Sequence, residues 1–188
     1  MLADLLRLCS GGAAAFVALI LLRAALHKVT DLDGFEGVLA DYGLIPEPAL
    51  KLLRATVPAL EVMAAAALCV SPVRLAGVVL ASGLLLIYGV VIATALRNGR
   101  TEIDCGCGGP PSPVSWGLVG RNLLLAAALV PSGLGLGEWR SPGEAAVGWA
   151  VALIGLSCWI ACEHLTANHH RMRPAHGPSP ADIFGAAA

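Results

Sequence analysis

The sequence is poor in charged and in aromatic residues. Only 13% of its 188 residues are Asp, Glu, Lys or Arg, whereas soluble domains carry roughly a quarter. The formal net charge of −1 gives no reason to expect a nucleic-acid partner. Aromatic residues make up 5% of the chain, too few for a surface on which bases could stack. The composition therefore excludes an ordinary soluble domain and argues against nucleic-acid binding.

Apolar residues dominate instead, at 57% of the chain, and the mean hydropathy is +0.76. A helix needs about 20 mainly apolar residues to cross the hydrocarbon of a bilayer. Segments of this kind lie at about 8–26, 52–70, 73–96, 116–130 and 145–165. We expect the first to be retained rather than cleaved as a signal peptide, because no small-residue cleavage site precedes His27. The sequence thus predicts an all-α membrane protein, a compact bundle of four to five transmembrane helices.

The connections between these segments differ in character. Ser71 and Pro72 alone separate the second and third segments, which should therefore be antiparallel neighbours. Residues 27–51 are predicted to form a polar loop of mixed charge. Residues 97–115 are predicted to form a second loop, which holds a cysteine pair and ends in a proline-rich stretch. The tail at 166–188 is rich in Gly, Pro and Ala and is expected to be disordered.

Cysteine is present but not dense. The six cysteines are too few for a fold held together by disulfides. Cys105 and Cys107 are one residue apart, in a glycine-rich stretch, so a disulfide between them would close a very small ring. Strained, exposed disulfides are the labile ones, and we therefore predict a redox-active pair. The alternatives are inert thiols or half of a metal site, although zinc sites show wider spacing and four ligands, so no metal is predicted.

Cys158 and Cys162 are a second candidate thiol pair. They are four positions apart in the last predicted helix and hence on one face of it. Free cysteine usually behaves as a small buried hydrophobe. The alternative is therefore a packing role, which we also expect for Cys9 and Cys69.

Charged and polar residues near the cysteine pair are candidates for supporting roles. Asp104 adjoins Cys105 and disfavours its thiolate unless a cation compensates. Arg121 and Asn122 lie near the start of the fourth predicted helix, just behind the loop. Arg121 is therefore expected to orient the loop, to bind a carboxylate such as that of Asp104, or to extend to the membrane interface.

Two charged residues lie inside apolar segments, where charges are costly and usually functional. Arg23 is in the first predicted helix and Glu61 in the second. Both helices run into the same loop, so we predict that the two side chains pair. The pair would be either purely structural or involved in quinone or proton handling.

The stretch Asp104-Cys105-Gly106-Cys107-Gly108-Gly109 resembles a motif of the methylamine utilisation protein family MauE. The resemblance continues through Val114-Ser115-Trp116 and Arg121-Asn122. A second set of residues is similar to the same family and to the wider DoxX-like group of small membrane proteins; it comprises Arg23 to Lys28, Asp31, Leu32, Phe35 and Tyr42 to Pro46. Together these matches cover roughly residues 10–135.

The resemblance implies a DoxX-like, multi-pass protein of the bacterial inner membrane, with Cys105 and Cys107 redox active. It also implies a role in maturing the small, disulfide-rich subunit of methylamine dehydrogenase, together with a thioredoxin-like protein, MauD. By analogy with helical-bundle disulfide enzymes of the vitamin K epoxide reductase group, a quinone would accept the electrons. The alternative is a non-catalytic assembly or docking factor, and a small transporter is suggested only by Arg23 and Glu61.

The orientation of the bundle is open to two interpretations. Five spans with a cytoplasmic N-terminus place the cysteine loop in the periplasm, as oxidative chemistry and the resemblance favour. The positive-inside rule favours the reverse, because the loop side is richer in basic residues. Those on the loop side are Lys28, Lys51, Arg54, Arg97, Arg100, Arg171 and Arg173, against Arg7, Arg74 and Arg140 on the other. We predict the periplasmic arrangement on the strength of the resemblance.

Overall fold

The computed structural model describes residues 2–101, 103, 105–106 and 113–172. Its elements are α1 (Leu2–Thr30), α2 (Leu32–Asp41), α3 (Glu47–Cys69), the short 3-10 helix η1 (Ser71–Val73), α4 (Arg74–Arg97), α5 (Trp116–Gly133) and α6 (Pro142–Met172). Four helices, α1, α3, α4 and α6, are long and apolar enough to cross a membrane. The predicted all-α membrane bundle is therefore confirmed. Helix α5 is shorter than these four helices and is not one of the candidate membrane spans.

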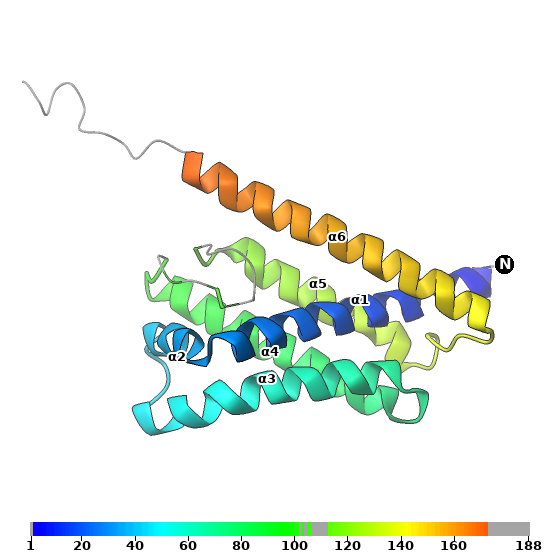
Figure 1. Cartoon of the computed structure of the whole chain (residues 1–188), viewed down its shortest axis with the longest axis horizontal. Helices are drawn as coiled ribbons and strands as arrows, with labels where there is room; N and C mark the ends of the chain where they lie inside the picture. The colour runs from blue at the N-terminus through cyan, green and yellow to red at the C-terminus, as the bar shows by residue number, and fades with distance from the viewer. Residues whose placement is uncertain (1, 102, 104, 107–112, 173–188) are drawn as a thin grey trace, which may run out of the picture.

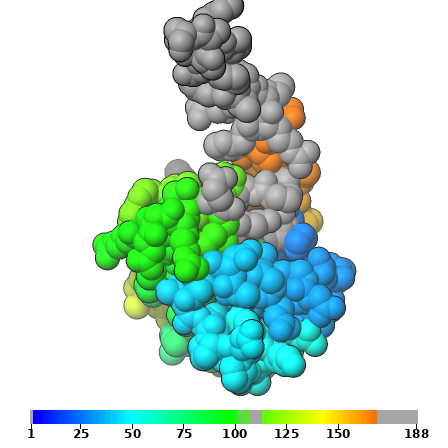
Figure 2. Space-filling model, turned by 90° about the vertical axis from the view of Figure 1, so that its left-hand side faces the viewer, coloured from blue at the N-terminus to red at the C-terminus, as the bar shows by residue number. Residues whose placement is uncertain are grey.

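The helices run up and down beside one another (Figure 1). Helix α1 packs against α3, α5 and α6, while α4 packs against α3 and α5. Helix α2 and the described residues between α4 and α5 lie at one end of the bundle, opposite the N-terminus, and this end is called the loop end below. Figure 2 views the molecule from that side, where α2 and the start of α3 lie beside the end of α4. The cysteine loop thus shares one end of the bundle with α2.

Small residues let the helices approach closely, as is common in lipid. Alanines from four helices are buried in the main core, together with larger side chains that are almost completely enclosed. The alanines are Ala14, Ala18, Ala64, Ala65, Ala81 and Ala126, and the larger residues include Val17, Leu21 and Leu129. A second core cluster lies at the loop end and contains Tyr42, Ile92, Ala95, Ile103 and Val114. This second cluster fixes both ends of the cysteine loop to the bundle.

Helices α3 and α4 are the antiparallel neighbours that the sequence predicts, joined through η1. The buried Arg74 side chain holds the turn, since its Nε donates to the Leu68 carbonyl (3.2 Å) and its Nη1 to the Gly137 carbonyl (2.8 Å). Gly77 provides the close approach, because a Cβ there would lie 2.6 Å from the Leu68 backbone nitrogen. Backbone cannot move aside as a flexible side chain can, so this position requires glycine.

Replacing Gly77 by alanine is expected to destabilise the bundle by about 1–3 kcal/mol, the usual cost of overpacking. Gly83, in the same helix, has open space around its Cβ position. Gly83→Ala is therefore the matched control, and it should be neutral or slightly stabilising because alanine favours helix. Thermal unfolding of both variants in detergent measures the difference. Equal stability of the two would show that α3 and α4 do not meet at Gly77.

The predicted polar loop at 27–51 is wrong in one respect, because most of it is helical. Helix α1 continues to Thr30, α3 begins at Glu47, and α2 lies between them. Asp31 caps α2, its carboxylate accepting from the Gly34 backbone N–H (2.9 Å). Pro48 lies in the first turn of α3, where proline is well tolerated.

The predicted disordered tail at 166–188 begins later than expected. Helix α6 runs to Met172, so residues 166–172 are helical. Nothing between Leu165 and Met172 interrupts a helix, and the first proline after them is Pro174. Residues 173–188 lie outside the described part of the chain.

Candidate functional site

Cys105 lies at the loop end, half-buried against the second core cluster. The loop is anchored on both sides, because the Val114 backbone N–H donates to the Ile103 carbonyl (3.1 Å) and both side chains are buried. Gly106 has a φ of +67°, and a Cβ there would lie 3.0 Å from Val38 Cγ1. Glycine therefore lets the chain turn tightly over α2 at this point. Cys105 is disulfide-bonded, while Asp104 and Cys107 lie outside the described residues.

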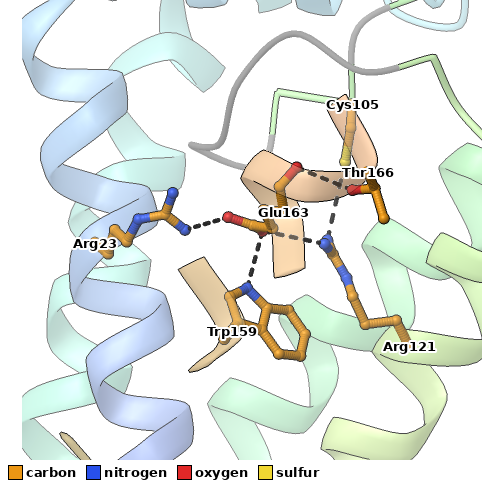
Figure 3. Close-up of polar contacts among 6 residues, drawn as sticks. All are labelled: Arg23, Cys105, Arg121, Trp159, Glu163 and Thr166. Carbon is orange, nitrogen blue, oxygen red and sulfur yellow. Dashed lines mark hydrogen bonds and ion pairs between the residues drawn. The ribbon is translucent and has the colours of Figure 1, made fainter. Parts of the chain in front are cut away.

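A cluster of charged side chains meets the Cys105 sulfur (Figure 3). Arg121 Nη2 lies 4.0 Å from Cys105 Sγ, and Arg121 Nη1 lies 3.6 Å from Glu163 Oε1. The other oxygen of Glu163 accepts from Arg23 Nη1 at 2.8 Å. Trp159 Nε1 also donates to Glu163 (2.8 Å), and the Arg121 guanidinium lies over the Trp159 ring, 5.2 Å from its centroid. A guanidinium fixed near sulfur favours the thiolate form of a cysteine.

Glu61 forms a second cluster deeper in the bundle and is completely buried. Lys28 Nζ and the Tyr88 hydroxyl both donate to Glu61 Oε1, each at 2.7 Å. The Lys28 ammonium also lies 5.3 Å from the centroid of the Phe35 ring and 5.6 Å from that of Tyr88. The buried carboxylate is thus matched by one buried cation and one hydroxyl, as a charge inside a membrane protein requires.

The predicted pair between Arg23 and Glu61 is wrong. Arg23 pairs with Glu163 of α6, and Glu61 pairs with Lys28 of α1. Five residues advance an α-helix by roughly 140° beyond one full turn, so Arg23 and Lys28 face different neighbours.

Sequence reasoning missed Glu163 and Lys28 as members of the site. Glu163 lies within the predicted span 145–165, so the rule that singled out Arg23 and Glu61 could have found it. Lys28 was assigned to a loop because the predicted first helix ended at residue 26.

A cavity of about 160 Å³ connects the two clusters. Its walls are mainly apolar, and its polar lining includes Lys28, Glu61, Tyr88, Arg121, Asn122 and Glu163, with Cys105 at the loop end. Asn122 is 2% exposed. The predicted supporting residues Arg23, Glu61, Arg121 and Asn122 therefore all line one space that also reaches Cys105.

The four cysteines outside the loop are arranged differently. Cys9, Cys69, Cys158 and Cys162 are free thiols on exposed parts of their helices. The expectation that Cys9 and Cys69 are packing residues is therefore wrong. Cys158 and Cys162 are absent from the cavity lining described above, although Trp159 and Glu163 beside them contribute to it. A role for them as a second thiol pair stays a prediction.

The family model described as methylamine utilisation protein MauE matches residues 6–135. The chain belongs to the MauE family. Its similarity extends to the MauE of Paracoccus versutus, 31% identical over 91% of each chain, and to that of Methylorubrum extorquens, 36% identical over 73% of this chain and 76% of the relative. The MauE of Paracoccus denitrificans is 37% identical over 64% of this chain and 66% of its own length. No solved structure matches the chain.

The part of the chain that matches the MauE family contains most of the site. Residues 6–135 include Cys105, Arg121 and the Lys28–Glu61–Tyr88 cluster. Glu163, which joins Arg23 to Arg121, lies beyond the matched region. In this MauE protein α6 therefore completes a site that the other helices build.

Proposed function

We propose that this protein is a membrane thiol–disulfide redox protein of methylamine utilisation, with Cys105 and Cys107 as its reacting pair. The observation that carries the proposal is the disulfide-bonded Cys105 with its sulfur 4.0 Å from the Arg121 guanidinium. We take Cys107, one residue away in the glycine-rich stretch, as the disulfide partner of Cys105. A cation beside one sulfur makes that sulfur the better leaving group in exchange.

The proposed reaction begins when a thiolate of a thioredoxin-like partner attacks Cys107. A mixed disulfide forms, the Cys105–Cys107 bond breaks, and Cys105 leaves as a thiolate beside Arg121. The partner's second thiol then breaks the mixed disulfide. The partner has lost two electrons and two protons and become a disulfide, and the cysteine pair has gained both. The oxidised partner is proposed to mature a disulfide-rich client, the small subunit of methylamine dehydrogenase.

Reoxidation of the pair requires a two-electron acceptor, and a quinone dissolved in the membrane meets this need. The second candidate function is a non-catalytic docking factor for the same process, in which the cysteines only shape the loop. It is favoured by the firm anchoring of the loop at Ile103 and Val114.

We propose that the protein lies in the inner membrane with its loop end in the periplasm. Several basic residues at the loop end, which the positive-inside rule would count against this arrangement, are engaged within the fold. Lys28 is paired with Glu61, and Arg54 with two carboxylates of α2. Arg100 donates to the Asp41 carbonyl (2.8 Å). We expect basic residues that are bound within the fold to influence membrane topology less than basic residues in short flexible loops.

Thiol labelling of intact cells tests this proposal. A membrane-impermeant maleimide is applied with and without prior reduction, and labelled peptides are identified by mass. We expect Cys105 and Cys107 to react only after reduction, since an outward-facing disulfide has no free thiol. Labelling that requires opening of the membrane would overturn the periplasmic arrangement. Labelling without any reduction would contradict an oxidised resting pair.

A further inference from the structure

The cavity between the two clusters contains buried polar atoms without partners. Glu61 Oε2 and Asn122 Nδ2 are fully buried and have no hydrogen-bond partner among the described residues. Both residues line the cavity. Leaving a buried donor or acceptor unsatisfied costs about 1–3 kcal/mol, and such atoms in a native protein call for an explanation. One acceptor and one donor on the same cavity indicate a ligand with polar atoms of its own.

The size and walls of the cavity restrict the ligand further. Its volume of about 160 Å³ is close to the ~150 Å³ of an engineered cavity that binds benzene, so one six-membered ring fits. Ile87 lines the cavity and is also 58% exposed on α4. At this point a single side chain therefore separates the cavity from the outer surface of the bundle, which would face lipid. A ligand that enters from the membrane would be apolar overall and carry polar atoms on its ring.

We propose that this cavity binds the ring of a quinone, which accepts the electrons of the reduced Cys105–Cys107 pair, and that Glu61 carries protons to and from the ring oxygens. The inference rests on the proposed function, because the dithiol supplies the electrons. Cys105 lines the loop end of the cavity, so the ring can approach its sulfur. A thiol relay through Cys158 and Cys162 has no comparable support, because neither is among the residues that line the cavity.

The reaction balances without any other reagent. Two S–H bonds break and one S–S bond forms, which releases two electrons and two protons. The quinone takes up all four and becomes a hydroquinone. Lys28 and Tyr88 both donate to Glu61 Oε1 and leave Oε2 free to accept from a hydroxyl of the hydroquinone, while Asn122 Nδ2 can donate to an oxygen of the quinone. The Glu61 carboxylate takes up a proton from the dithiol at Oε2 and passes it to the reduced ring, so it is again a carboxylate after each transfer.

Binding is tested first, on the oxidised protein in nanodiscs, where no turnover occurs. Trp159 lines the cavity, so decylubiquinone should quench its fluorescence in a saturable way, and Trp159→Phe should remove the saturable part. Decylubiquinol should bind at the same site, and Glu61→Gln should weaken its binding on the order of tenfold, because the variant removes the charged acceptor for a hydroquinone hydroxyl. Glu138→Gln, at an exposed carboxylate between α5 and α6, is the matched control and should bind like the wild type.

Electron transfer is tested next, on the fully reduced protein, by the absorbance change of decylubiquinone. Glu61→Gln should lose quinone reduction but still exchange disulfides with reduced thioredoxin. Because this variant leaves Lys28 unpaired, Lys28→Met/Glu61→Gln repeats the test with a neutral pair. Binding and quinone reduction at wild-type levels in both variants would overturn the role of Glu61, and quenching without saturation would overturn the site. A wild-type protein that binds quinone but exchanges no disulfide would refute the proposed function and leave the site standing.

Discussion

Replacing either Cys105 or Cys107 by serine is expected to reduce maturation of the methylamine dehydrogenase small subunit to background. A single thiol can enter a mixed disulfide but has no second sulfur with which to complete two-electron exchange. A partner whose second cysteine is replaced by serine should accumulate as a mixed disulfide with the wild-type pair but not with Cys105→Ser, because a lone Cys107 thiol offers no disulfide to attack. Dehydrogenase activity of cell extracts measures maturation, and non-reducing gels followed by mass spectrometry detect the adduct.

The matched control for these variants is the double replacement Cys158→Ser/Cys162→Ser. Both residues are exposed free thiols on α6, so we expect maturation to continue without them. If Cys105→Ser and Cys107→Ser also mature the client normally, the two cysteines are not redox active. The non-catalytic docking function then replaces the redox function as the better explanation. Loss of maturation in the α6 variant alone would place the reacting thiols on α6 instead.

Replacing Lys28 by methionine is expected to destabilise the bundle by about 3–5 kcal/mol, the cost of leaving a buried charge without its partner. Glu61 is completely buried, and Lys28 is the cation that contacts it, at 2.7 Å. In Lys28→Met/Glu61→Gln neither member is charged, and most of the lost stability should return. Unfolding in detergent, followed by heat or by titration with a denaturing surfactant, measures the free energy for each variant.

The control for this cycle is Arg54→Met, which breaks ion pairs at the surface. Arg54 contacts Asp33 and Glu36 at 2.7 and 2.8 Å, and the Asp33 side chain is 92% exposed. Exposed pairs contribute about 0–1 kcal/mol, so this variant should remain close to the wild type. A Lys28→Met protein as stable as the wild type would mean that Glu61 is already neutral in the folded protein.

The sequence predicted the bundle because the signal for membrane helices is compositional and strong. Runs of apolar residues specify helices such as α4 without any knowledge of their neighbours. Helix ends depend on local contacts instead. The polar segment at 27–51 contains α2 because Asp31 caps it and Phe35 is buried. Neither contact has a hydropathy signal.

Several residues of the site could be predicted from the sequence, but the contacts between them could not. Arg23, Glu61, Arg121 and Asn122 were identified because polar residues near or within apolar segments are conspicuous. Which of these side chains meet depends on how each helix is rotated about its axis. Small residues permit close packing at several rotations, so the sequence does not specify which one is adopted. The cavity is a further consequence of this packing and has no signature in the sequence.

Helix α6 has one more consequence, which concerns the balance of charge beside the Cys105 sulfur. Glu163 is a single negative charge held between two positive ones, Arg23 and Arg121. The three side chains together carry one surplus positive charge, and that surplus lies next to Cys105. Because Glu163 lies outside the family-matched residues 6–135, the electrostatic potential at this sulfur depends on a helix that the matched region does not include. A neutral residue in place of Glu163 would raise the surplus to two positive charges, so α6 sets the electrostatic potential beside Cys105.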